Sequence, residues 1–327
     1  MKRITLAIAA FAGLFALATT AVPSHAETVF PARTVKMIVP YPPGGGTDLL
    51  ARVLAQRLGE KWKQSVIVEN VGGAGGNVGA EQVARAAPDG YTLLFASPGP
   101  LATNVFMYKK MPYDVAKWTP LAVVATSPYV LVVSPHFPAT NVAQVIADAK
   151  AKPGALTSAT PGIGSLGQFA TIEFEMLAKV KLLQVPYKGL SPAVADVLGG
   201  NVNMMFDMMA TALPLHKAGK EKIVAIGATK RVPQLPDVPT LAEAGVTGYR
   251  AVTFFGLVAP PKMPDALADR INADVVACMK EPAFIDKTKA LGMDLSPTSR
   301  ADAAKFFADE RTLWGKVIEQ AGIKPME

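Results

Sequence analysis

IVPYPPGGGTD, at residues 38–48, joins a short apolar run to a glycine-rich turn and then to the start of an amphipathic pattern. LTSATPGIGS, at residues 156–165, repeats this order. A glycine turn that leads into a helix leaves free backbone N–H groups at the positive end of the helix dipole, and this arrangement suits an anion. Two such turns in one chain predict a clamp that holds a small anion from both sides.

Strand and helix patterns alternate around the first turn. A β-rich run at 35–39 comes before it, and an apolar stripe with helical spacing follows it. We predict that Thr47 or Asp48 caps this helix and that Gly59 ends it. The alternation continues as strand, helix and strand up to residue 97. This order predicts a parallel sheet with right-handed crossovers.

The same alternation starts again in a second unit. The apolar run 121–134 is interrupted by Ser127 and Pro128, where we place a crossing into this unit, and the run 252–259 looks like the return. Two α/β lobes, two crossover segments and a helical C-terminal tail are typical of a hinged cleft protein, whose ligands lie at the carboxyl ends of strands. The predicted domains are residues 27–127 plus 251–327 and residues 128–250, after a signal peptide at 1–26.

The N-terminus has the features of that signal peptide. Lys2 and Arg3 precede an apolar run at 4–18, and small residues before and at Ala26 fit cleavage after it. A membrane anchor is the alternative, but the run is short for one. Removal of the segment takes two of the 33 basic residues and none of the 26 acidic ones, so the net charge falls from +7 to +5. We predict an exported protein whose modest positive charge either attracts anions or serves solubility.

Residues that carry catalysis or bind metals are scarce. Outside the signal segment, His136 and His216 stand in unrelated contexts, and Cys278 lies on an apolar helical pattern that indicates a buried thiol. GIGSLG at 162–167 matches the dinucleotide fingerprint, but VPYK at 185–188 lacks the acidic residue that such a site needs. No basic run with interleaved aromatic residues points to nucleic acid. We therefore predict no catalysis, no metal, no cofactor and no nucleic-acid partner.

Several features have two interpretations each. Asp48 either caps the first helix, which we favour, or binds an ammonium group of the ligand. Asp207, at the end of a strand facing the cleft, carries the same ambiguity. The methionines around Asp207 are favoured as core filling over a pocket wall. The glycine cluster at 72–76 is favoured as a flexible loop over a ligand contact.

A set of short motifs extends along the mature sequence. In order, they are VPYPPGGGTD (39–48), VEN (68–70), PDGYTLL (88–94), GIGS (162–165), VPYKG (185–189) and PDVPT (236–240). With these motifs the chain resembles the Bug-type extracytoplasmic solute receptors, which are the binding components of tripartite tricarboxylate transporters. The resemblance implies a periplasmic binding protein fold, α/β in class, that closes on its ligand.

The resemblance also implies a ligand and a site. In this family, backbone amides of the first loop and ordered waters hold one ligand carboxylate, and the second domain closes over it. We therefore expect a monomer that captures a small organic carboxylate, either a dicarboxylate or an aromatic carboxylate, for the membrane subunits of such a transporter. The predicted ligand-binding residues are Tyr41, Gly44, Gly45, Gly46, Thr47, Asp48, Ser97, Thr160, Gly162, Gly164, Ser165, Gln168, Tyr187 and Asp207.

One position departs from the family pattern. Gln168 stands where the family often has histidine, three residues after the serine of the second turn. Glutamine can donate a hydrogen bond but carries no charge. We therefore expect the far end of the ligand to be neutral, aromatic or weakly polar, and the second turn to select the ligand.

Two other functions stay open. One is a sensor that presents its ligand to a membrane kinase. The other is a secreted hydrolase, against which the scarcity of histidine counts.

Overall fold

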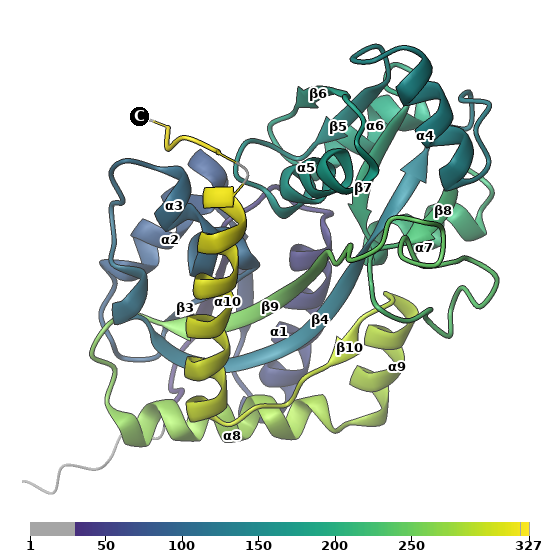
Figure 1. The fold of residues 1–327 in the computed structure, drawn as a ribbon. Coiled ribbons are helices and arrows are strands. Elements are labelled where there is room, and N and C mark those ends of the chain that lie inside the picture. The colour runs from purple at the N-terminus through teal and green to yellow at the C-terminus, as the bar shows by residue number, and fades with distance from the viewer. Residues whose placement is uncertain (1–29, 321, 327) are drawn as a thin grey trace, which may run out of the picture.

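Two α/β lobes form the molecule (Figure 1). The computed structural model describes residues 30–320 and 322–326, so the predicted signal peptide at 1–26 lies outside the described residues. The long strand β4 (Thr119–Val133) runs from one lobe into the other, and the chain returns before β9 (Val252–Ala259). The predicted fold class is confirmed.

Lobe 1 is built around a mixed sheet. Its strands are β1 (Val35–Val39), β2 (Val66–Asn70), β3 (Thr92–Ala96), β9, the first part of β4 and β10 (Asp294–Leu295). Strand β1 pairs in parallel with both β2 and β3, as the strand–helix alternation predicted. Strand β9 then runs antiparallel between β3 and β4. Its helices are α1 (Gly46–Trp62), α2 (Asn77–Ala84), α3 (Asn104–Met107), α8 (Asp265–Met279), α9 (Pro282–Ala290) and α10 (Arg300–Gln320).

Lobe 2 repeats the design on a smaller scale. Its strands are β5 (Thr157–Thr160), β6 (Leu183–Pro186), β7 (Met204–Met208), β8 (Lys222–Ile226) and the second part of β4. Strand β5 is parallel to β6 and β7, whereas β7 and β8 run antiparallel to β4. Its helices are α4 (Val142–Ala151), α5 (Leu166–Ala178), α6 (Leu190–Leu198) and α7 (Met209–Lys217).

The lobes meet where β4 changes partners. Up to Pro128 this strand pairs with β9, and from Tyr129 it pairs with β7. At the same point, three backbone hydrogen bonds of 2.7–2.8 Å connect Tyr129, Gly227 and Ala251 in a closed ring. A Cβ on Gly227 would lie 2.8 Å from the carbonyl oxygen of Tyr129, so glycine permits this close crossing. Both connections between the lobes therefore pass through one tightly packed region. This region lies next to the predicted domain boundary at 127/128, which stays a prediction.

The first helix shows how local sequence and packing combine. Leu50, Leu54 and Leu58 are fully buried, as the apolar stripe requires. Helix α1 nevertheless continues past Gly59 to Trp62, so the predicted stop at Gly59 is wrong. A Cβ at Gly59 would lie 3.3 Å from the carbonyl oxygen of Gln64, so this glycine lets the chain leading into β2 approach the helix.

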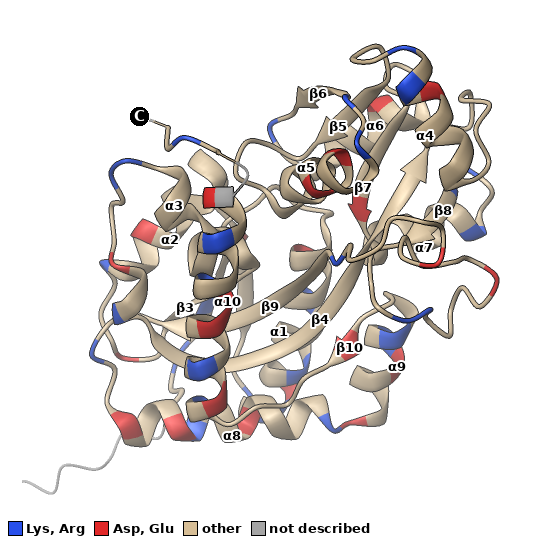
Figure 2. Cartoon of the chain, viewed as in Figure 1, with Lys and Arg blue, Asp and Glu red and all other residues tan. Residues whose placement is uncertain are grey.

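Charged residues lie mainly on the helices and loops that surround the sheets (Figure 2). Helix α10 carries both signs along its length, and Arg300 at its start pairs with Asp265 and Asp269 of α8 at 3.0 and 2.8 Å. In the described residues, no helix combines the length and the apolar character needed to cross a bilayer.

Candidate functional site

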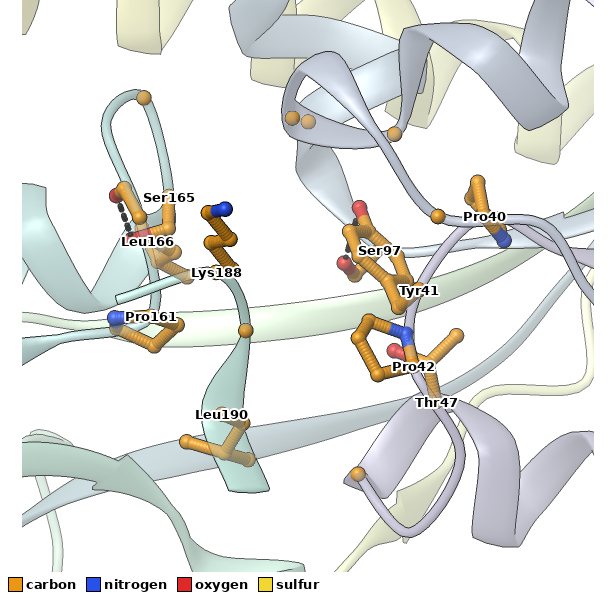
Figure 3. A pocket seen from close by; sticks show the side chains of 18 of the residues that line it. Pro40, Tyr41, Pro42, Thr47, Ser97, Pro161, Ser165, Leu166, Lys188 and Leu190 are labelled. Carbon is orange, nitrogen blue, oxygen red and sulfur yellow. Dashed lines mark hydrogen bonds between the residues drawn. The ribbon is translucent and has the colours of Figure 1, made fainter. Parts of the chain in front are cut away.

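A cavity of about 720 Å³ lies between the lobes. Lobe 1 contributes the turn that leads into α1, residues 72–76 and residues 97–99, whereas lobe 2 contributes residues 161–166 and 186–191. Figure 3 shows the two sets of loops facing each other across this space. The size falls within the range of small-molecule sites.

The start of α1 presents unpaired backbone donors to this cavity. Gly45 is the N-cap and makes no side-chain capping bond, so the predicted caps Thr47 and Asp48 are wrong. Within the described chain, no acceptor pairs with the amide N–H groups of Gly45, Gly46, Thr47 or Asp48. These are the four donors that every helix start leaves open. Here they lie at the wall of a cavity, at the positive end of a 17-residue helix.

The carboxylate of Asp48 supports the turn from behind. It accepts the backbone N–H of Gly44 at 3.0 Å and the amide of Asn70 at 2.9 Å, and it forms a two-pronged ion pair with Arg52 at 2.9–3.0 Å. Burial alone would raise the pKa of Asp48, but the hydrogen bonds from Arg52, Gly44 and Asn70 outweigh it and hold the pKa below its usual range. Asp48 is therefore an anion whose charge is neutralised by Arg52 and whose hydrogen bonds stabilise the turn.

A neutral phenol lies beside these amides. Ser97 donates to the hydroxyl oxygen of Tyr41 at 2.8 Å (Figure 3), which leaves the phenolic proton of Tyr41 available to a ligand. Burial raises the pKa of Tyr41 well above its usual value, although the bond from Ser97 works against this. Tyr41 therefore stays a hydrogen-bond donor at any physiological pH.

The second glycine turn satisfies its own polar groups. Ser165 caps α5: its hydroxyl accepts from the backbone N–H of Gln168 at 3.2 Å and donates to the carbonyl of Gly162 at 2.6 Å. The side-chain oxygen of Gln168 accepts from the N–H of Gly164 at 2.8 Å. Both glycines need positive φ, 141° and 77°. Gln168 thus holds the turn in shape and does not line the cavity.

Residues 187–191 form the remaining wall of lobe 2. The hydroxyl of Tyr187 donates to Asp196; burial and this carboxylate raise the pKa of Tyr187 to about 12. Lys188 lines the cavity, is exposed, and has no carboxylate partner among the described residues. In Figure 3 its ammonium end lies between the Ser165 turn and the Tyr41–Ser97 pair.

The two lobes touch at one rim of the cavity. The hydroxyl of Ser191 donates to the carbonyl of Pro43 at 3.2 Å. A Cβ on Gly189 would lie 2.9 Å from the ring of Pro42, and Gly189 has a φ of 139°. The structure therefore represents a closed arrangement on this side, in which the glycine leaves room for Pro42.

Asp207 lies apart from the cavity. It is fully buried on β7, where one carboxyl oxygen accepts from the N–H of Met208 at 2.6 Å and from Thr211 at 2.7 Å while the other has no partner. Burial raises the pKa of Asp207 to about 7. Met204, Met205 and Met209 are buried around it, whereas Met208 lines the cavity.

The predicted site residues divide into two groups. The cavity wall brings together Tyr41, Gly45, Gly46, Thr47, Asp48, Ser97, Gly162, Gly164, Ser165 and Tyr187. The residues away from the wall are Gly44, Thr160, Gln168 and Asp207. Their roles in binding a ligand stay predictions.

Sequence reasoning missed much of the wall, including residues 72–76, Tyr108, Tyr129, Lys188 and Met326. A signal existed for two of these. The glycine cluster follows β2 just as the other turns follow strands, and Lys188 stands in the VPYKG motif after β6. Nothing local marks Tyr129 or Met326. The described residues contain no group of three or more His, Cys, Asp or Glu side chains that could hold a metal.

The sequence also matches a family model. The model described as tripartite tricarboxylate transporter family receptor matches residues 50–323. The chain belongs to this receptor family. BugT of Bordetella pertussis is 35% identical over 315 residues, which span 95% of this chain and 96% of BugT. The predicted Bug-type family is thereby confirmed.

Solved structures agree with this membership in the receptor family. Rpa4515 of R. palustris, solved with adipate, is 36% identical with a TM-score of 0.88 over 91% of this chain and 100% of that one. MatC of Rhodopseudomonas palustris, with bound malate, is 31% identical with a TM-score of 0.83 over 88% of this chain and 100% of that one. Receptors of this family are periplasmic and bind solutes without catalysis, so the hydrolase alternative is rejected.

Proposed function

We propose that this receptor binds a small organic carboxylate, with one carboxylate group at the N-terminus of α1. The observation that carries the proposal is the set of four unpaired amides from Gly45 to Asp48 at the cavity wall. Charge-assisted hydrogen bonds from such amides are short and strong. The phenolic proton of Tyr41 adds a donor beside them. The adipate and malate in the related structures support this ligand class.

A second anionic group on the ligand is favoured by the charges of the cavity. Asp48 and Lys188 are the charged side chains in its wall, and Arg52 neutralises Asp48. Lys188 is therefore, among the residues that the structure describes, a cation without a carboxylate partner on the lobe opposite α1. The expectation of a neutral far end relied on Gln168, which holds its own turn instead. We propose a dicarboxylate whose second group lies near Lys188.

The body of the ligand should be apolar. Apart from the glycines and polar groups, the cavity is lined by rings and aliphatic side chains, among them Pro40, Tyr41, Pro42, Tyr108, Tyr129, Ile163, Leu166, Leu190 and Met208. Such a wall favours an aliphatic or aromatic spacer over a compact, hydroxyl-rich acid.

The partners and location proposed here follow from family membership. We propose that a signal peptide is cleaved after Ala26, and that the mature monomer delivers its ligand to the membrane subunits of a tripartite tricarboxylate-type transporter in the periplasm. Hinge closure would present a new surface to those subunits. Deletion of the gene should abolish uptake. Intact uptake with lost induction would instead favour the sensor.

Calorimetry on ligand-stripped protein tests the ligand. We expect adipate to bind more tightly than hexanoate, which has the same length but one carboxylate. Lys188→Met should weaken adipate binding by roughly tenfold, because one charge contact is lost in a partly solvated position, and should leave hexanoate unchanged. Lys181→Met removes the same charge from an exposed position outside the cavity and serves as the control. Equal loss for both acids, or none, contradicts the role of Lys188.

A further inference from the structure

The C-terminal tail bends back sharply at the end of α10. The N–H of Gly322 donates to the carbonyl of Glu319 at 3.0 Å, and the N–H of Ile323 donates to that of Ile318 at 3.2 Å. Gly322 has a φ of +64°. This is the Schellman pattern, in which a left-handed glycine reverses the chain direction at a helix end. The tail therefore leaves α10 along a fixed path.

That path leads to the ligand cavity. Met326 pairs with the segment after α3: its N–H donates to the carbonyl of Met107 at 2.8 Å, and its carbonyl accepts from Lys109 at 2.8 Å. These two bonds form a parallel bridge opposite Tyr108. In Figure 1 the yellow tail runs from the end of α10 past α3. Residues distant in sequence thus meet at the cavity edge, where both Tyr108 and Met326 line it.

The side chain of Met326 packs against a hydrophobic cluster that both lobes contribute to. The members of this cluster include Met107 from lobe 1 and Leu166 and Phe169 from α5 in lobe 2. Leu166 lines the cavity as well. A thioether at this position is flexible enough to fill an irregular space beside a ligand.

We propose that Met326, held by the tail, is a specificity-determining residue that limits the length of the ligand. The inference rests on the proposed carboxylate function. One carboxylate of the ligand is fixed at α1, so the room left by Met326 decides how many methylene groups fit. Each methylene buried or excluded changes the affinity by about fourfold.

A chain-length series tests the proposal. Calorimetry with succinate, glutarate, adipate, pimelate and suberate gives the profile of the ligand-stripped wild-type protein. Met326→Ala should shift the optimum to a longer diacid: the best wild-type ligand loses about fourfold and the next longer one gains. Met326→Phe should shift the optimum to a shorter diacid. Met176→Ala, at a 53% exposed methionine of α5, is the matched control and should keep the wild-type profile.

The outcomes separate the two claims. If the wild type binds diacids but the Met326 variants keep the same optimum, the role of Met326 is overturned and the proposed function stands. A uniform loss across the series, with a lower melting temperature, also overturns it, because that result indicates a structural role alone. If the wild type binds no diacid in the series, the proposed function fails and the inference falls with it.

Discussion

At the residue scale, the backbone N–H of Gly45 can be removed by a substitution that changes little else. Gly45 has φ −81°, which is close to the angle that proline imposes, so Gly45→Pro removes one N–H with little distortion. If this amide holds a carboxylate, losing one hydrogen bond to a charged group should weaken binding of adipate by about 10–100-fold. Isothermal calorimetry measures the change.

A matched variant isolates the amide. Gly45→Ala keeps the N–H, and its Cβ would lie 3.9 Å from Leu190, an ordinary contact. We expect Gly45→Ala to bind adipate nearly as well as the wild type, and both variants to melt within a few degrees of it. Similar affinities for the two variants would show that the amide is not a ligand contact.

At the element scale, rim closure depends on the loop between β6 and α6. Gly189→Ala would force a Cβ to within 2.9 Å of Pro42 and would strain a backbone with φ 139°. We expect the closed state to be disfavoured and adipate affinity to fall at least tenfold, by a loss of about 1.4 kcal/mol or more. Small-angle scattering should show less compaction on ligand addition.

The control for this substitution separates the effect of backbone strain at positive φ from the effect of the contact with Pro42. Gly219 also has positive φ, +69°, but a Cβ there meets nothing within 4 Å. Gly219→Ala should lower the melting temperature through strain alone, by about 1 kcal/mol of stability, and leave adipate binding unchanged. If Gly219→Ala weakens binding as much as Gly189→Ala does, general destabilisation explains the effect.

Element ends could be predicted where local chemistry decides them. Asn141 caps α4 and accepts the N–H of Gln144 at 3.0 Å, a bond that the spacing of these two residues favours. Thr240 and Glu243 form both bonds of a capping box, at 2.7 and 3.1 Å, yet only a turn follows. Gly45 could not be predicted as a cap because it makes no side-chain bond. Propensity describes where a helix can start, and packing decides whether it continues.

The cavity wall was predictable only in part, because packing between distant segments also decides which residues line it. The glycine turns end strands, so their position follows from the topology. Tyr129 reaches the cavity because β4 changes partners beside it, and Met326 because the tail returns to Met107. Both depend on contacts between residues far apart in sequence, which a local pattern does not encode. Gln168 shows the reverse: its side-chain oxygen bonds Gly164 and it does not line the cavity, so its contact with the ligand stays a prediction.

At the scale of the whole molecule, buried carboxyl groups should make stability depend on pH. Burial raises the pKa of Asp207 to about 7; burial, with Asp207 nearby, raises that of Glu221 to about 8. Glu221 is 3% exposed, and neither of its side-chain oxygens has a partner. Both groups bind protons more tightly in the folded chain than in the unfolded chain. The stability that these two groups add to the folded state is therefore fully present below about pH 4, and it is lost as the pH rises through 7–8.

Glu221→Gln should remove much of the fall in folding stability at alkaline pH. The variant keeps the shape of the side chain but cannot ionise, so we expect it to exceed the wild type in stability by about 1–3 kcal/mol at pH 8.5 and by little at pH 5. Melting curves across this range give the comparison, since 1 kcal/mol shifts the melting temperature of a chain this large by about 2–4 °C. Glu319→Gln, at an exposed position on α10, should follow the wild-type curve at every pH. If Glu221→Gln also follows that curve, Glu221 gains access to water or a partner when it ionises, and the pH dependence must come from other groups.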